Sequence, residues 1–186
     1  LVELDIVPCF HSDPVGLLLS HRADWAIVSE IEHNDDVIFK PLFSYEMVGI
    51  CSKNHSLAEK DIWEAEDFID ETWVTYPVPD DMLDLWRKVL KSKGINPTRR
   101  TTELTIAMSQ LVASKRGIAT VPYWAALPYL EKGYVVARKI TKSGLYSNLY
   151  AAIRKEDESL SYLEDFYQTV KSQSFSTLPG LSVLNL

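Results

Sequence analysis

The histidines and cysteines are the side chains most able to bind a metal or to act as nucleophiles, so their spacing comes first. No two of the four histidines form an HExxH pattern, and the two cysteines form no CxxC pattern; the histidines are His11, His21, His33 and His55. Such spacings bring two ligands together on one helical turn or in one tight loop. The sequence therefore predicts no metal site.

The candidate nucleophiles are equally isolated. Cys9 and Cys51 lie in apolar, strand-like stretches, so we expect two buried free thiols rather than a disulfide framework. One His-Ser pair occurs at 11–12, without a G-x-S-x-G elbow or a nucleophile beside a plausible base. The 7 glycines are all far apart, which excludes a glycine-rich phosphate loop. These patterns predict neither an enzyme nor a bound cofactor.

The amino-acid composition limits which partners this segment could bind. Asp and Glu number 26 against 19 Lys and Arg, giving a formal net charge of −7. Binding to DNA or an anionic membrane needs a basic face, so we expect neither from this segment alone. The basic pairs at 99–100, 115–116 and 138–139 are interpreted as solvated ends of strands or helices. A hydrophobic content of 46% is sufficient for a core, and no apolar run is long enough to cross a membrane.

The elements that must position any site follow a β/α rhythm. Apolar runs predict strands at 2–8, 23–29, 37–43, 46–53, 73–76, 98–103, 118–122, 135–140 and 145–155. Helices are predicted at 13–21, 61–68, 82–93, 105–116, 125–132 and 160–172, three of them closed by Gly94, Gly117 and Gly133. This alternation indicates a largely parallel α/β sheet, and the many short strands favour two small lobes. The strand at the very start suggests a fragment.

Several segments carry a resemblance to a known family. The strand 23–29, the following Lys40-Pro-Leu-Phe43 and the turn Lys53-Asn-His-Ser-Leu-Ala58 resemble the effector-binding domain of LysR-type transcriptional regulators. The resemblance is closest to members that control methionine biosynthesis genes in response to homocysteine. It is carried, in order, by Thr75-Tyr-Pro-Val78, Leu83-Asp-Leu-Trp-Arg87, Met108-Ser-Gln-Leu-Val-Ala113, Gly117-Ile-Ala119, Val121-Pro-Tyr-Trp124 and Leu149-Tyr-Ala-Ala-Ile-Arg154.

The resemblance implies two Rossmann-like lobes joined by a two-strand hinge, as in type II periplasmic binding proteins. The first lobe would comprise 1–46 with 150–186, lacking its opening strand and helix, and the second 47–149. It also implies a cytoplasmic homo-oligomer, dimeric or tetrameric, that senses a small effector in the cleft between the lobes. DNA would be bound only by a helix-turn-helix domain outside this chain.

Homocysteine has a carboxylate, an ammonium group and a short thiol arm, and candidate effector residues can be named for each of them. Thr102 and Thr105, at the start of the 105–116 helix, would bind the carboxylate, or else simply cap the helix. Glu103 and Glu30 would pair with the ammonium, unless they are surface acids. Aromatic and apolar residues at strand ends would surround the thiol arm, unless they belong to the core: Phe10, Tyr76, Val78, Pro122 and Tyr123. His11 and Ser29 lie in first-lobe loops that line such pockets, although His11 also fits an exposed loop.

One alternative shares the fold. A solute-binding protein of a transport system has the same two-lobe architecture, and a secretion signal upstream would favour it. An upstream helix-turn-helix would favour the regulator.

Overall fold

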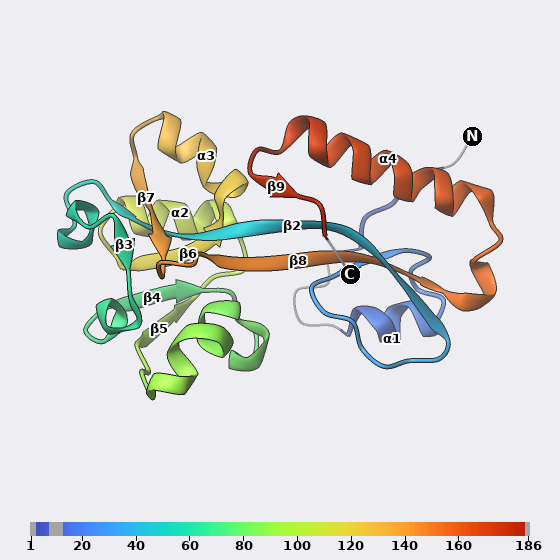
Figure 1. Ribbon diagram of the computed structural model, residues 1–186, viewed down its shortest axis with the longest axis horizontal. Helices are drawn as coiled ribbons and strands as arrows, with labels where there is room; N and C mark the ends of the chain where they lie inside the picture. Colours follow the sequence, from blue (N-terminus) through green and yellow to red (C-terminus); the bar gives the residue numbers. More distant parts are fainter. Residues whose placement is uncertain (1–2, 8–12, 185–186) are drawn as a thin grey trace. The chain divides into compact units, whose positions relative to one another are not determined.

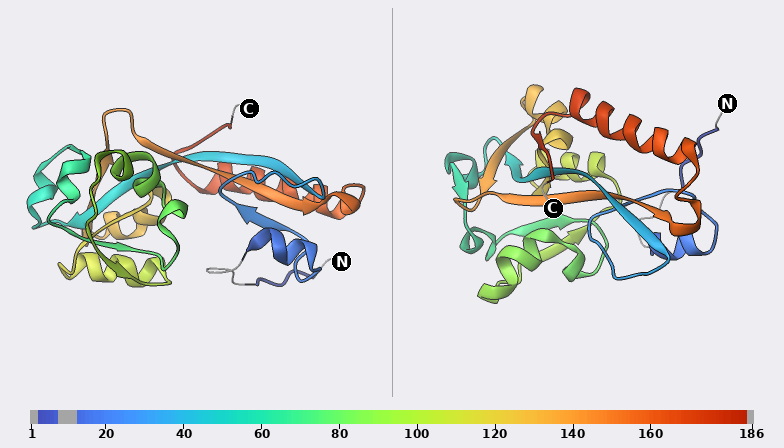
Figure 2. Two further views of the ribbon diagram at one scale, coloured as in Figure 1. Left: turned by 90° about the horizontal axis from the view of Figure 1, so that it is seen from below. Right: turned by 45° about the vertical axis from the view of Figure 1, so that its right-hand side comes forward.

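The computed structural model describes residues 3–7 and 13–184. The chain forms two compact units: a first unit of residues up to Ser44 together with those from Ser147, and a second unit, Tyr45–Tyr146. Strands β2 (Val37–Ser52) and β8 (Leu145–Arg154) contribute residues to both units, and they are neighbours in the sheet (Figures 1 and 2).

The first unit is a small sheet with two helices. Its other elements are α1 (Pro14–Leu19), β1 (Ala26–Val28), α4 (Ser161–Thr177) and β9 (Leu181–Ser182). Strand β1 is antiparallel to β8, and β9 pairs with β2. Asp13 is the N-cap of α1 and Pro14 opens it, where proline costs no helical hydrogen bond. Val15 and Leu18 of α1 pack into the core beneath the sheet strands.

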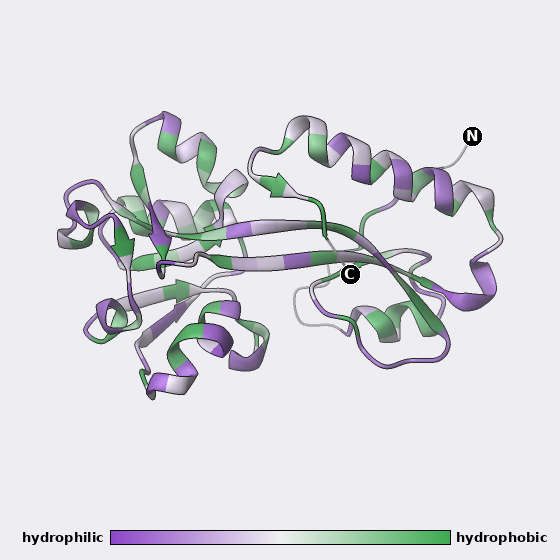
Figure 3. Cartoon of the chain, viewed as in Figure 1, coloured by the Kyte–Doolittle hydropathy of each residue, from purple (hydrophilic) through white to green (hydrophobic). Residues whose placement is uncertain are grey.

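Helix α4 covers the first unit with one apolar stripe. Hydrophilic residues occupy much of its length, with hydrophobic residues between them (Figure 3). Leu163 and Tyr167 are the buried positions, four residues apart and so on one face. The Tyr167 hydroxyl donates to the carbonyl of Pro41 at 2.7 Å, which satisfies the polar end of a buried ring.

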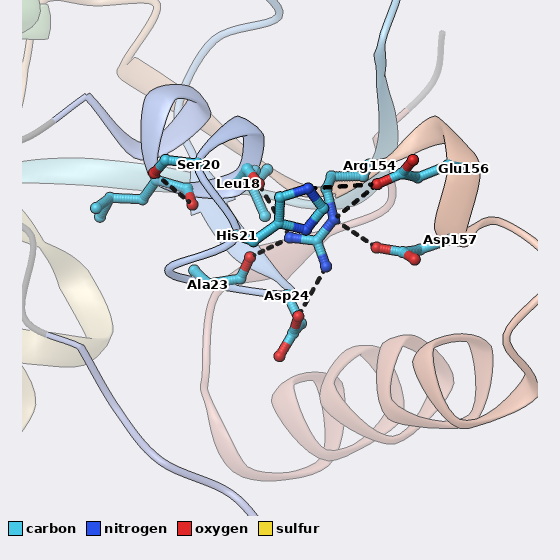
Figure 4. Close-up of polar contacts among 9 residues, drawn as sticks. Leu18, Ser20, His21, Ala23, Asp24, Arg154, Glu156 and Asp157 are labelled. Carbon is cyan, nitrogen blue, oxygen red and sulfur yellow. Dashed lines mark hydrogen bonds and ion pairs between the residues drawn. The ribbon is translucent and has the colours of Figure 1, made fainter.

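A buried arginine ties the first unit together (Figure 4). Nη1 of Arg154 donates to the carbonyls of Leu18 at 3.0 Å and Ala23 at 2.6 Å. Nη2 pairs with Asp24 and Nε with Asp157, while only 8% of the side chain is exposed. Burial alone would lower the pKa of Arg154, but the bonds to Asp24 and Asp157 raise it overall, so the guanidinium stays charged.

The second unit is a mixed sheet with helices and short turns around it. It contains β3 (Ile62–Trp63), β4 (Thr72–Thr75), β5 (Thr98–Thr101), α2 (Thr105–Ala113), β6 (Ile118–Pro122), α3 (Tyr123–Glu131) and β7 (Val135–Ile140). The strand order is β3-β7-β2-β6-β4-β5. Strand β4 is parallel to β5 and β6, and β3 is parallel to β7. Strand β2 is antiparallel to β6 and β7, so the sheet is mixed rather than largely parallel.

The core of the second unit is divided by its sheet. Trp73 belongs to one hydrophobic cluster and its neighbour Val74 to the other, as do Ile118 and Ala119. Successive strand residues face opposite sides, so the two clusters lie on the two faces. The α/β class predicted from the β/α rhythm is confirmed.

Several element predictions need correction. The expected strand 2–8 is absent over residues 3–7, where Leu4 and Ile6 are 66% and 78% exposed. Alternation alone does not make a strand, because the backbone needs a pairing partner. The strands predicted at 37–43 and 46–53 are one 16-residue strand, β2, because it finds pairing partners along its length in β8, β6, β7 and β9.

Two predicted helices also differ. The segment 61–68 forms β3 and then a 3-10 turn, Ala65–Phe68, held by reciprocal bonds between Glu64 and Asp67. In the segment 82–93, Met82 ends a separate 3-10 turn, Asp80–Met82. The following helix begins at 84, with a π turn over Trp86–Leu90 and a 3-10 turn after it. Gly94 closes this helix at φ 66°, as predicted.

Candidate effector site

The predicted effector residues of the second unit converge on one edge of its sheet. Tyr76 follows β4, Thr102 follows β5, and Pro122 is the last residue of β6. These three strands are adjacent and parallel, so their carboxyl ends lie together. The amide of Thr102 donates to the carbonyl of Thr75 at 3.0 Å, which continues the pairing to this edge. In open α/β sheets this is the edge where ligands bind.

Helix α2 begins at the same edge without a side-chain cap. Its N-cap is Leu104, which has no side-chain oxygen, and Thr105 is the first helical residue. The hydroxyls of Thr105 and Tyr76 share a hydrogen bond of 2.6 Å. The N-cap side chain therefore gives the first-turn amides of α2 no acceptor, and these amides stand beside two hydroxyls. Such donors, at the positive end of a helix, suit a carboxylate.

Arg99 holds the loop that carries Tyr76 and Val78, and the sequence interpretation missed it. Its Nη2 donates to the carbonyls of both residues at 3.2 Å. Its Nη1 pairs with Asp80, and the guanidinium lies 5.9 Å from the ring centroid of Trp73. Arg99 is thus a structural clamp rather than a solvated strand end. The one signal for this role is Trp73, the residue opposite Arg99 on β4, because an aromatic ring attracts a cation that lies over its face.

The apolar candidates serve both the core and this edge. Val78 packs against the cluster of Trp73, and Tyr76 and Tyr123 pack against the cluster of Val74. Each is half-buried, and Pro122 is the N-cap of α3. The two interpretations offered by the sequence, core and pocket, are therefore both compatible with the packing.

Two buried donors near this edge were also missed. Trp124 Nε1 and Ser109 Oγ are buried without a hydrogen-bond partner among the described residues. Trp124 follows Tyr123 in α3, and Ser109 lies one turn after Thr105 in α2. An unsatisfied buried donor costs about 1–3 kcal/mol, which makes both groups candidates for a ligand contact.

The remaining predicted residues lie elsewhere. Glu103 is exposed after β5, and Ser29 and Glu30 are exposed after β1 in the first unit. Phe10 and His11 fall outside the described residues. The membership of these five in one site with Tyr76 stays a prediction.

Metal binding, thiol chemistry and membrane insertion each depend on particular features of the described residues. Residues 3–7 and 13–184 hold no group of three His, Cys, Asp or Glu side chains placed to bind a metal. Burial raises the pKa of the Cys51 thiol to about 11, against an ordinary value of 9.0. Cys51 is free and buried, as predicted, whereas Cys9 lies outside the described residues. Within the same ranges, no helix is both long and apolar enough to span a membrane.

The family follows from comparison with known proteins. The model of the LysR substrate-binding domain matches residues 1–174, and the chain belongs to this family. Solved structures similar to this chain include LysR regulatory domains, which have the type II periplasmic-binding-protein fold, and this confirms the predicted fold class.

Particular relatives carry the name MetR. The chain is 96% identical over 186 residues to the HTH-type transcriptional regulator MetR of Haemophilus influenzae, and 31% identical over 178 residues to MetR of Escherichia coli K12. It covers 60% and 56% of these relatives. The regulatory domain of MetR from N. meningitidis superposes with a TM-score of 0.91 at 63% identity, over 98% of this chain and 85% of that one. The resemblance inferred from the sequence is therefore confirmed.

Proposed function

We propose that this effector-binding domain senses homocysteine and thereby controls genes of methionine biosynthesis. The proposal rests on the similarity to proteins named MetR and on the chemistry of the edge formed by β6, β4 and β5. A ligand that binds one arrangement of the protein better than another shifts the population toward it. That shift would re-orient DNA-binding domains outside this chain.

One observation carries the ligand chemistry: the hydroxyl pair of Tyr76 and Thr105 at the uncapped start of α2. The carboxylate of an amino acid would accept from the first-turn amides and from a hydroxyl. The thiol arm would lie against the half-buried Tyr123 and Val78, while Trp124 Nε1 supplies a further donor. Glu103 is the candidate partner of the ammonium. Ser29, Glu30, Phe10 and His11 of the first unit are proposed to complete the contacts.

Calorimetric titration of the chain with homocysteine, and with methionine as the comparison, tests the proposal. We expect saturable binding of homocysteine and weaker binding of methionine, whose extra methyl group must be accommodated. Thr105→Val should weaken binding at least about tenfold, since a lost hydrogen bond to a charged group is worth roughly 1.5–3 kcal/mol. Thr98→Val, on an exposed strand position, is the matched control and should bind normally.

The outcomes separate two questions. Failure of the unchanged protein to bind homocysteine would contradict the proposed effector. Binding that survives Thr105→Val would keep the effector but remove Thr105 from the site.

The wider role is also a proposal. The chain would act within a homo-oligomeric cytoplasmic regulator, without catalysis and without a resident cofactor. The names of the relatives favour this over the solute-binding alternative, since they describe transcriptional regulators.

A further inference from the structure

A polar pocket lies in the second unit, at the opposite edge of the sheet from the candidate effector site. It has a volume of about 290 Å³. Its lining includes Thr72 at the start of β4 and Gly117 just before β6, so it opens at the amino ends of strands whose carboxyl ends form the effector edge. Nothing in the proposed function uses it.

Three cations dominate this pocket: Arg100, Lys115 and Arg116. None of them makes an ion pair with a carboxylate among the described residues, although the chain as a whole carries a net charge of −7. Two acids, Asp70 and Glu71, share the lining. The cations therefore outnumber the carboxylates in the pocket.

Glu71 is already engaged. His55 Nδ1 accepts from the amide of Leu57 at 3.2 Å, so its other nitrogen, Nε2, carries the proton of the neutral ring. Nε2 lies 3.3 Å from a carboxylate oxygen of Glu71. Asp70 is then the one lining carboxylate without a described partner, and it shares the lining with three cations that make no described ion pair.

Helix capping does not account for the basic residues at the end of α2. The last carbonyls of the helix accept backbone amides: Ser114 bonds to Gln110, Lys115 to Val112 and Arg116 to Leu111, at 2.9–3.0 Å. The Ser114 hydroxyl also donates to Gln110 and Leu111. The carbonyls of Gln110, Leu111 and Val112 are satisfied without the side chains of Lys115 and Arg116, which stay available to a ligand.

The backbone around these cations is unusual. Lys115 has a φ of 62°, a left-handed conformation that glycine adopts more easily than lysine. A Cβ at Gly117 would lie 2.3 Å from the carbonyl oxygen of Thr72, so only glycine allows β4 and the end of α2 to approach so closely. A glycine at 115 would relieve the backbone but would remove one charge from the pocket.

We propose that this pocket binds a phosphate group, either free phosphate or the phosphate of a small ester. Guanidinium and ammonium groups are the donors that bind such an oxyanion, and Arg100 and Arg116 offer two planar forks for it. The site is distinct from the effector edge, so the inference stands independently of homocysteine binding.

The test is calorimetric titration of the 186-residue chain with inorganic phosphate and with a nucleoside monophosphate, at constant ionic strength set by chloride. We expect saturable binding, and the tighter of the two ligands identifies the source of the phosphate. The variant Lys115→Gln with Arg116→Gln should bind at least about tenfold more weakly, because two charge-assisted contacts are lost. Arg100→Gln provides a second, independent variant, on β5.

Lys132→Gln is the matched control, since Lys132 is a cation at the end of α3 in the same unit. Its phosphate affinity should not change. Absence of saturable binding by either ligand would overturn the proposal, as would equal affinity in all variants. A duplex oligonucleotide that binds through these cations, when neither small ligand does, would overturn it in favour of a nucleic-acid contact.

Discussion

The phenolic oxygen of Tyr76 lies 2.6 Å from Oγ1 of Thr105, joining the end of β4 to the start of α2. The two residues are 29 positions apart. The bond satisfies none of the first-turn amides, but it fixes the first turn of α2 against β4. The relationship links the stability of the second unit to the edge proposed to bind the effector.

The first prediction concerns this bond alone. Tyr76→Phe and Thr105→Val should each lower the free energy of unfolding by about 1 kcal/mol, the usual net value of such a bond. The double variant should lose less than the sum, since both changes remove one shared bond. Urea denaturation of the four proteins measures this, and strict additivity would show that the hydroxyls act separately.

The second prediction concerns Arg99. Arg99→Met should speed amide hydrogen exchange over residues 76–80, because the guanidinium holds the carbonyls of Tyr76 and Val78. The loss of stability should be modest, about 1 kcal/mol or less, since the pair with Asp80 is near the surface. Arg100→Met, the adjacent strand residue, is the control. Unchanged exchange in this loop would remove Arg99 from its role as a clamp.

The third prediction concerns Arg154. Arg154→Met should lower the free energy of unfolding by about 3–5 kcal/mol, because buried partners lose their charge-assisted bonds. The carbonyls of Leu18 and Ala23 and the carboxylate of Asp157 would be left without this donor. Arg22→Met is the control, an exposed arginine of the same unit. Equal stability of the two variants in urea would contradict the central role of Arg154.

The fourth prediction concerns Cys51. A pKa raised to about 11 by burial keeps this thiol protonated and unreactive at pH 8. Iodoacetamide should leave Cys51 unmodified in the folded protein, with mass spectrometry as the measurement. In denaturant the pKa falls back toward 9.0 and labelling should become rapid. Because the neutral form is favoured on folding, this thiol destabilises the fold only at pH values above its unfolded pKa. Rapid labelling of the native protein would contradict its burial.

Much of the local structure was predictable. The strands 118–122 and 135–140 have the predicted bounds, and Gly94 and Gly133 close helical segments with positive φ. These features depend on local periodicity and on the backbone freedom of glycine, both of which are visible in one short window.

The wrong strand predictions share one cause, which is the lack of information on pairing partners in a local sequence pattern. The segment 2–8 has a strand pattern, yet residues 3–7 have no pairing partner in the described chain. The segments 37–43 and 46–53 form one strand because β2 pairs along its length with β8, β6, β7 and β9. Pairing partners lie far away in the sequence, so a local pattern cannot decide them.

The sequence by itself determined the family, the α/β class and the residues at the ends of β4, β5 and β6, because motif order and periodicity are written along the chain. Only the tertiary structure decided what Arg99, Arg100 and Arg154 do. Arg99 holds the loop of Tyr76 and Val78, Arg100 lines the polar pocket, and Arg154 is buried and joins segments of the first unit. The roles of Arg99 and Arg154 depend on carbonyls and carboxylates up to 136 residues away, which only folding brings within hydrogen-bond distance. Arg100 lines a pocket that exists only in the folded chain.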